Sequence, residues 1–349
     1  MLHVGMVLSR SRLDICVMDD NGTILEEAPW PPDADGLRHL VRHVAERFAG
    51  GEVLGVVESM NGARFVHDTL ELAGWSVELA DAQKVKGLAP LACKTDKIDA
   101  RVLAELSRRD LVPSIWLPSS ETRGARERAR WRLHLVRHRV ALKNRVHAIL
   151  LAFGKPCPVS DLFGTRGREL LARLEVPEPW ASNVLAAVGL IDILDEQIDG
   201  IERDLRRLGA ADHPYVPLLM TVPGIGGVLS YTIAAEIGDI ARFALPKKLV
   251  AYTGLCPRVY QSGGKDHRGS LSKNGPKYLR WALIEAATHA ARHPAYREHY
   301  ERTATRLGRQ RGKKVARVEV ARKLAEAIFY MLKKGEPFGP YLDNSRIAA

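Results

Sequence analysis

The sequence predicts a protein of the α/β plus α class, in which a domain with a mixed sheet is followed by a mostly helical region. The first 115 residues alternate short apolar runs with helical stretches, which is typical of strands and helices that share one sheet. From residue 121, a long segment without proline repeats apolar residues at helical spacing. With 349 residues, the chain is long enough for two or three domains with substantial cores.

The strands of the first domain are predicted by short apolar runs separated by turn signals. Asn21-Gly22 is one such signal, so the first three runs predict an antiparallel meander. The predicted strands cover residues 2–8, 13–19, 22–28, 52–59 and 75–80, and the helices between them cover 36–50 and about 62–73. This order, βββαβαβα, is typical of a ribonuclease-H-like domain, although order alone also suits other α/β folds.

Two long helices are predicted in the middle of the chain. Residues 121–151 carry apolar side chains at helical or heptad spacing, and residues 180–209 carry a second apolar stripe. The two helices are expected to pair as an antiparallel arm or to coil against another subunit. Arginines occur throughout 121–151, and a solvated helix face is favoured over contact with a phosphate backbone.

The charge balance favours an anionic polymer as partner. Lys and Arg total 52 against 41 acidic residues, a formal net charge of +11, so nucleic acid is the expected partner, although a basic housekeeping protein would show the same balance. The four cysteines form no C-x-x-C pair, which argues against a zinc ribbon and a disulfide framework. No apolar stretch approaches the roughly 18 residues of a membrane span, and no secretory signal is recognised, so a cytoplasmic protein without a membrane partner is expected.

Three acidic residues are candidates for a metal site. Asp96 and Asp99 open a predicted helix, where Thr95 or Asp96 would cap the backbone and Asp99 would face the positive helix end. The same spacing places both carboxylates on one helix face, where Mg²⁺ could use them. Glu58 ends a buried strand, the edge at which ligands bind in such sheets, or else it caps the next helix.

Residues 218–240 read as helix, Pro-Gly-Ile-Gly turn and helix, the pattern of a helix-hairpin-helix. Gly224 and Gly226 permit the tight turn, and N–H groups at the start of the second helix could face a phosphate. The alternative is a glycine turn between two core helices. The Pro-Gly-Ile-Gly sequence of the turn favours binding of nucleic acid over the purely structural alternative.

A serine lies among glycines and cations in residues 258–280. Ser262 precedes two glycines that would let a backbone approach closely, and a serine hydroxyl can attack a phosphodiester. The cations expected to hold the phosphate are Arg258, Lys265, Arg268, Lys273, Lys277 and Arg280, with His267 among them. A polar loop that only contacts phosphates would look the same, and Ser270 and Ser272 are further candidates. After Pro294 the chain is again helical and basic, with a helix expected over 311–335.

These segments together resemble one family, the transposases of the insertion-sequence-110 type, also called DEDD transposases. The resemblance covers almost the whole chain. It rests on "VGMVLSRSRLDICVMDDNG", "VVESMNG", "CKTDKIDARVLAEL", "VPGIGGVLSYTIAAEIGDIARFALPKKLVAYTGLCPRVYQSGGKDHRGSLSKNGPKYLRWAL" and "GKKVARVEVARKLAEAI". The last stretches are long and keep their order, so chance does not account for the agreement.

The resemblance implies an N-terminal RuvC-like domain that binds Mg²⁺ through four acidic residues, a coiled-coil arm and a C-terminal transposase domain with a nucleophilic serine. The matching residues are Glu58, Asp96 and Asp99 for the metal and Ser262 for the covalent attack on DNA. The implied divisions are 1–115 for the RuvC-like domain, 116–212 for the arm, 213–335 for the transposase domain and 336–349 for a tail.

The resemblance also implies the partners and the place of action. Target and donor DNA are the substrates, and a structured non-coding guide RNA, the bridge RNA, selects both. The protein is expected to form a homo-oligomer, a dimer or tetramer, in which the acidic cluster of one subunit meets the serine domain of another. Its place is the bacterial cytoplasm, in association with the nucleoid during action.

The chain departs from the family pattern at Val7. The pattern V-G-x-D reads "VGMV" here, so the first carboxylate is missing, and valine cannot bind Mg²⁺. Asp14 is close in sequence, but nothing in the sequence directs it into the same cluster.

The favoured hypothesis is a mobile-element recombinase that cuts and rejoins DNA through a serine–DNA intermediate. The alternative is an impaired family member that binds RNA and DNA without recombining them. A nuclease using metal-activated water is disfavoured, because it leaves the serine loop unused.

Overall fold

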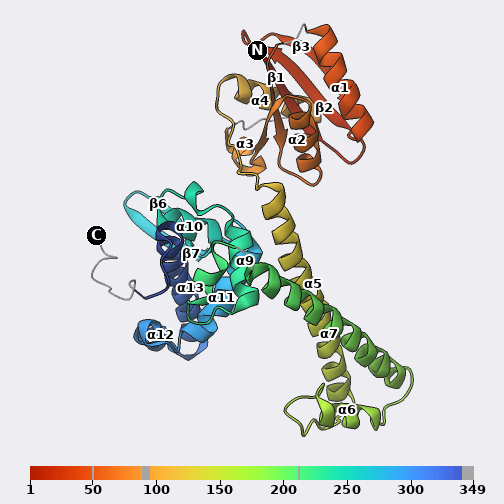
Figure 1. Ribbon diagram of the computed structural model, residues 1–349, viewed down its shortest axis with the longest axis vertical. Helices are drawn as coiled ribbons and strands as arrows, with labels where there is room; N and C mark the ends of the chain where they lie inside the picture. The colour runs from red at the N-terminus through yellow and green to blue at the C-terminus, as the bar shows by residue number, and fades with distance from the viewer. Residues whose placement is uncertain (49–50, 89–94, 211–212, 340–349) are drawn as a thin grey trace. The chain divides into compact units, whose positions relative to one another are not determined.

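The computed structural model describes residues 1–48, 51–88, 95–210 and 213–339, without the side chains of 265–268 and 309 (Figure 1). The chain divides into two compact units, Met1–Leu117 and Pro118–Ala349. Each unit contains buried apolar clusters of its own.

Unit 1 is built on a five-stranded mixed sheet. Its elements are β1 (Leu2–Leu8), β2 (Leu13–Asp19), β3 (Ile24–Trp30), α1 (Ala34–Arg47), β4 (Val53–Glu58), α2 (Ala63–Leu72), β5 (Ser76–Ala80), α3 (Ala82–Leu88) and α4 (Asp96–Arg108). The strand order is β3-β2-β1-β4-β5, with β1 to β3 antiparallel and β4 and β5 parallel to β1. The predicted meander and the mixed sheet are confirmed.

The third strand begins later than the sequence predicts. It starts at Ile24 rather than at residue 22, because the preceding residues form a turn. In that turn the Asp19 carboxylate accepts hydrogen bonds from the N–H groups of Asn21 and Thr23, and Gly22 has a positive φ of 87°. The turn signal at Asn21-Gly22 was therefore correct, and the start of the strand was predicted two residues too early.

Side chains of the sheet alternate between two layers. Val4 and Met6 pack in a cluster formed with α1 and α2, whereas Val7 packs with Cys16, Val56 and residues of α4. The sheet is therefore covered by α1 and α2 on one face and by α4 on the other (Figure 1).

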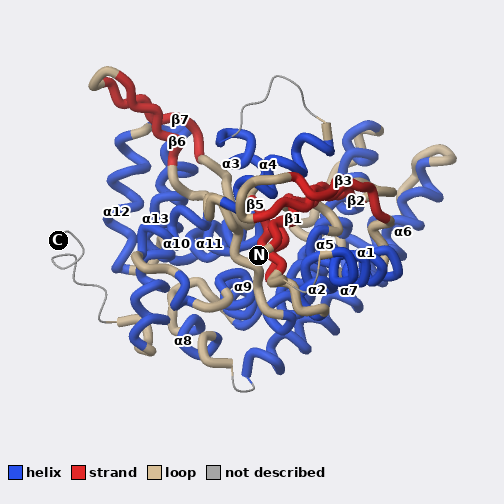
Figure 2. The backbone as a smooth tube through the Cα atoms, turned by 90° about the horizontal axis from the view of Figure 1, so that it is seen from above, coloured by secondary structure: helices blue, strands red, loops and turns tan. Residues whose placement is uncertain are grey.

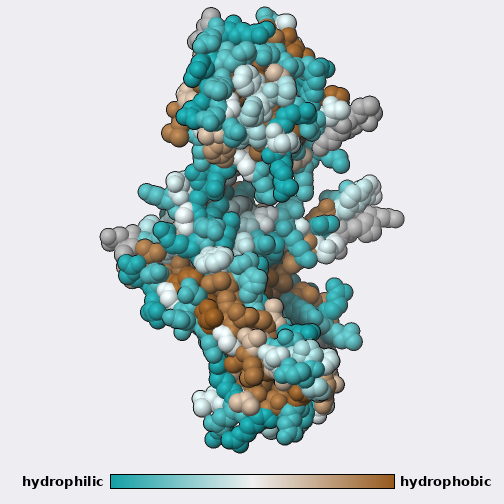
Figure 3. Space-filling model, turned by 90° about the vertical axis from the view of Figure 1, so that its right-hand side faces the viewer, coloured by the Kyte–Doolittle hydropathy of each residue, from teal (hydrophilic) through white to brown (hydrophobic). Residues whose placement is uncertain are grey.

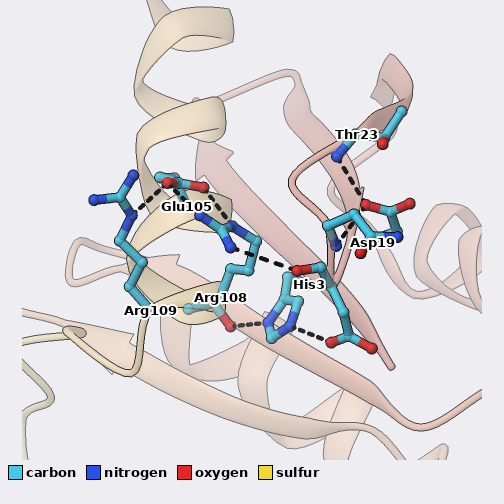
Figure 4. Close-up of polar contacts among 9 residues, drawn as sticks. His3, Asp19, Thr23, Glu105, Arg108 and Arg109 are labelled. Atoms are coloured by element: carbon cyan, nitrogen blue, oxygen red, sulfur yellow. Dashed lines mark hydrogen bonds and ion pairs between the residues drawn. The ribbon is translucent and has the colours of Figure 1, made fainter.

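Helix α4 lies directly on β1. A methyl group on Gly5 would lie 1.9 Å from the carbonyl oxygen of Ala100, so only glycine permits this approach. His3 holds the other end of the contact: its Nδ1 lies 2.9 Å from Ser107 Oγ, and its Nε2 lies 3.2 Å from the Asp20 carboxylate (Figure 4). The middle and the end of α4 are thereby fixed over the sheet.

We expect Gly5→Ala to lower the free energy of unfolding by about 1–3 kcal/mol, because the methyl group forces α4 away from β1. Gly87→Ala on α3 is the matched control, since a methyl group there meets nothing within 4 Å. Urea unfolding measures both variants. A Gly5→Ala chain as stable as the Gly87→Ala chain would show that α4 does not pack this closely.

Unit 2 is mostly helical. Its elements are α5 (Ser120–Ala152), α6 (Thr165–Ala172), α7 (Trp180–Ala210), α8 (Val216–Met220), α9 (Gly227–Ile237), the 3₁₀ helix η1 (Ile240–Arg242), α10 (Pro246–Thr253), β6 (Pro257–Ser262), β7 (Lys265–Leu271), α11 (Lys277–Ala290), α12 (Pro294–Arg306) and α13 (Gly308–Lys334). The helices predicted over 121–151, 180–209 and 311–335 are confirmed as α5, α7 and α13.

Helices α5 and α7 lie side by side and antiparallel (Figure 1). Arg132 pairs with Glu202 and Arg139 pairs with Asp195, so residue numbers rise along one helix as they fall along the other. Of the two predicted arrangements, the chain therefore forms the antiparallel pair. The predicted winding of these helices into a coiled coil stays a prediction.

The expected solvated arginine face of α5 is wrong for several of its arginines. Arg126 is buried and donates to the carbonyl oxygens of Ala235 and Glu236 at the end of α9. Arg130 forms an ion pair with the fully buried Glu236 carboxylate, with Nε–Oε1 at 2.7 Å. Breaking such a pair leaves a buried charge without compensation, which typically costs about 3–5 kcal/mol. These arginines join α5 to the C-terminal helices.

A membrane span is not found in the part of the chain that the structure describes, because no helix there combines sufficient length with sufficient apolar character.

Candidate functional site

The three predicted acidic residues lie on two elements of unit 1. Glu58 is the last residue of β4 and alternates with Val56, so it lies on the sheet face that α4 covers. Asp96 is the first residue of α4 and Asp99 lies in its first turn. The N-cap is Thr95, whose hydroxyl accepts the N–H of Ile98 at 3.3 Å, so Asp96 is not the cap. The carboxylates therefore come from a strand end and from the helix that lies over it.

Val7 lies at the same level of the sheet as Glu58. Met6 pairs with Val57 across the parallel strands β1 and β4, which places Val7 and Glu58 one residue further along both strands. Val7 is 5% exposed and packs among apolar side chains. Val7, the position of the missing carboxylate, thus lies beside Glu58 in the acidic region, which is formed by Glu58, Asp96 and Asp99. The surroundings of the Val7 side chain are apolar.

Asp14 lies on this face as well, which was not predicted from the sequence. It pairs with Val7 in the β1–β2 register, and it is buried with 9% exposure. Arg12 Nε donates to the Asp14 carboxylate at 2.8 Å, and Arg12 Nη2 lies 4.0 Å from Asp96 Oδ2. The alternation of apolar Leu13 with Asp14 next to a short turn was the signal that could have placed it.

These residues fit a hard divalent cation by the chemistry of their donors, since Mg²⁺ and Ca²⁺ prefer carboxylate oxygens. The Arg12 guanidinium already brings a positive charge between two of the carboxylates. Within the described residues, however, no three His, Cys, Asp or Glu side chains form an assembled metal centre. The acidic region therefore provides carboxylates of a suitable kind, but among the described residues three of them do not lie close enough together to form a metal centre.

A second ion cluster fixes α4 from the side. Arg101 and Lys97 of α4 pair with Glu27 of β3, with Lys97 Nζ at 3.0 Å from Oε2. The hydrogen bond from Arg101, followed by that from Lys97, lowers the pKa of Glu27 from 4.5 to about 2. Near the end of α4, Arg108 and Arg109 similarly lower the pKa of Glu105 to about 2 (Figure 4).

We expect Glu27→Gln to remove a pH-dependent contribution to stability. The folded pKa of Glu27 is below its unfolded value, so its stabilisation is complete above about pH 4.5 and is lost as the pH falls toward 2. The loss at pH 7 should be about 1 kcal/mol, because both cationic partners are largely exposed. Urea unfolding from pH 7 to 3 measures it, with the exposed Glu46→Gln as control. A variant whose pH profile parallels the unmodified chain would contradict this role.

Ser262 lies at the tip of a β-hairpin rather than in an irregular loop. It ends β6 and pairs with Lys265 of β7, and the two residues between them, Gly263 and Gly264, have positive φ values of 56° and 77°. The hairpin projects from the helical body, and Ser262 is exposed (Figure 2). The glycines therefore form the turn that presents the hydroxyl. Gly263-Gly264 between two extended runs is a sequence signal that could have predicted this hairpin.

The cations around Ser262 differ in their surroundings. Arg258, Lys273 and Lys277 are exposed. Arg280 is partly buried, donates from Nη1 to the carbonyl oxygen of Thr253 at 3.2 Å, and has its pKa lowered by burial. The first three are therefore open to a phosphate, and Arg280 also closes the end of α10. The predicted roles of the Lys265 and Arg268 side chains, and the position of the His267 side chain, lie outside the described part of the structure.

Gly224 and Gly226 have different surroundings in the loop between α8 and α9. Gly224 has a φ of 84°, and a methyl group there would lie 2.4 Å from the carbonyl oxygen of Ala286, so packing on α11 requires this glycine. Gly226 is exposed at the N-cap of α9, where a methyl group would meet nothing within 4 Å. Of these two glycines, Gly226 is thus the one that is open to a ligand. Helix α8 has five residues, and the helix-hairpin-helix assignment stays a prediction.

Comparisons with known proteins agree with this arrangement. A sequence model of the transposase IS116/IS110/IS902 family matches residues 216–301, and a model of the IS110 DEDD transposase domain matches residues 4–154. The transposase for insertion sequence element IS1328 of Yersinia enterocolitica is 33% identical over 238 residues, which cover 66% of this chain and 69% of that protein.

Two further relatives extend the match. The transposase for insertion sequence element IS1111A of Coxiella burnetii is 28% identical over 81% of this chain and 78% of its own length. The pilin gene-inverting protein of Moraxella lacunata is 24% identical over 96% of this chain and 97% of its own length.

The fold and these matches define a transposase, an enzyme class that cuts DNA. The chain belongs to the IS116/IS110/IS902 family of insertion-sequence transposases. A DEDD transposase domain indicates the use of divalent metal in general.

Proposed function

We propose that this transposase recombines DNA through a covalent intermediate on Ser262. The Ser262 oxygen attacks a phosphodiester, a serine–phosphate ester forms, and one P–O bond to a sugar oxygen breaks, with that oxygen taking up a proton. A sugar hydroxyl of a second strand end then attacks the ester, and the serine is released. The observation that supports this most is the exposed hydroxyl at a glycine hairpin tip, with the exposed Arg258 at the start of the same strand.

The acidic residues of unit 1 are the proposed metal ligands. Glu58, Asp96 and Asp99 would hold Mg²⁺, which when bound supplies positive charge near the reacting phosphate. The ribonuclease-H-like strand order β3-β2-β1-β4-β5 and the shared sheet face support this assignment. The divisions at residues 115, 212 and 335 remain predictions.

Nucleic acids and a second copy of the chain are the proposed partners. Target and donor DNA are the substrates, and a structured guide RNA selects them. The surface of unit 2 carries apolar patches (Figure 3), and the exposed apolar residues of α7 include Leu185, Leu190 and Ile193. These residues support an oligomer, because exposed apolar patches often mark contacts with another chain. A DNA-inverting reaction is supported by the pilin gene-inverting relative.

One observation favours a second candidate function. Val7 is buried among apolar side chains where the family pattern has a carboxylate, so the chain would bind RNA and DNA without recombining them. The two candidates differ in chemistry and share their partners.

We expect Ser262→Ala to abolish covalent attachment to DNA while DNA binding persists, because the exposed hydroxyl contributes to no described fold contact. Denaturing gels with labelled DNA measure attachment, and gel shifts measure binding. Ser270→Ala and Ser272→Ala are matched controls that should keep the adduct. Normal strand exchange by Ser262→Ala would refute the proposed chemistry.

A plasmid recombination assay with Val7→Asp separates the two candidates. The leading proposal expects recombination by the unmodified chain and by the variant. Thermal unfolding must first show that Val7→Asp folds, because the change buries a carboxylate in an apolar cluster. Recombination by the variant alone would favour the impaired-enzyme function instead.

A further inference from the structure

Three neighbouring strands carry a row of positions across the α4-facing side of the sheet. Asp14 of β2 pairs with Val7 of β1, and Val7 is level with Glu58 of β4. Adjacent strands lie about 5 Å apart, so the backbones of Asp14 and Glu58 are separated by roughly 10 Å. Two carboxylate side chains that extend from the same face can reach one cation across such a distance. Asp14 thus flanks the position where the first carboxylate is missing.

Arg12 shows that Asp14 and Asp96 face the same small space. One guanidinium contacts both: Nε lies 2.8 Å from Asp14 Oδ2, and Nη2 lies 4.0 Å from Asp96 Oδ2. A residue of β2 and the first residue of α4 therefore share one positive charge. A divalent cation in that space would meet the same two carboxylates.

Resting on the proposed function, we propose that Asp14 supplies the carboxylate that Val7 lacks, and that Arg12 is the cation that Mg²⁺ displaces. Asp14 would bind the metal together with Glu58 and Asp96. The side chain of Arg12 is 53% exposed and that of Asp14 is 12% exposed, so the guanidinium can move into solvent while the carboxylate stays in place.

The test is Mn²⁺ binding to the full chain, followed by electron paramagnetic resonance of the free ion. Asp14→Asn should weaken binding about tenfold or more, the scale of losing a group that supports a metal. Asp35→Asn is the matched control, because Asp35 is an exposed residue of α1. Arg12→Gln should tighten binding, because it removes the competing cation.

A rescue variant separates metal binding from a purely structural role of Asp14. The double change Val7→Asp with Asp14→Asn returns the carboxylate to β1 and should restore Mn²⁺ affinity. If Asp14 served only as the partner of Arg12, the double variant would stay weak and the inference would be overturned. Circular dichroism shows that each variant is folded.

The failure of this inference is distinguishable from failure of the proposed metal site. If Asp96→Asn weakens Mn²⁺ binding and Asp14→Asn does not, the inference is overturned and the proposed site stands. If Glu58→Gln, Asp96→Asn and Asp14→Asn all bind Mn²⁺ like the unmodified chain, both are overturned. Weaker binding by Arg12→Gln would also overturn the role given to Arg12.

Discussion

The acidic region depends on the close contact between α4 and β1. Gly5 allows the helix backbone to lie on the strand, and the His3–Ser107 hydrogen bond and the Arg101–Glu27 ion pair hold it there. This contact brings the start of α4, with Asp96 and Asp99, to the sheet face on which β4 ends at Glu58. A helix held further away would leave these carboxylates without a common position. The metal site proposed for unit 1 therefore depends on Gly5, although Gly5 itself binds no metal.

In unit 2 the proposed reactive group, the Ser262 hydroxyl, is exposed to solvent, whereas the carboxylates of unit 1 lie between a sheet and a helix. Its helices are joined by a large apolar cluster and by contacts such as the ion pair of Arg130 with the fully buried Glu236. The hairpin itself carries Ser262 at its tip and exposes Val259 and Tyr260, which are 59% and 73% exposed. Such side chains suit contact with a substrate or another chain. The packed helical body and the exposed tip together fit attack on a large polymer.

Local patterns predicted most of the fold. Alternation and turn signals located the five strands of unit 1, and apolar spacing located α5, α7 and α13. The sequence missed features that depend on distant segments. Arg126 and Arg130 read as surface charges because their partners on α9 are more than 100 residues away. Asp14 was not assigned because its direction follows from strand register, and the packing of Gly224 on α11 could not be predicted from the Pro-Gly-Ile-Gly turn.

The central chemical claim is that Ser262 forms the bond to DNA, and mass spectrometry of the trapped adduct tests it most directly. Trypsin releases residues 259–265, "VYQSGGK", in which Ser262 is the single serine, whereas Ser270 and Ser272 fall in residues 269–273. After nuclease digestion, the account predicts a nucleotide mass on the 259–265 peptide, which fragmentation of the peptide places on Ser262 and not on Tyr260. A nucleotide on 269–273 or on any other peptide would contradict it.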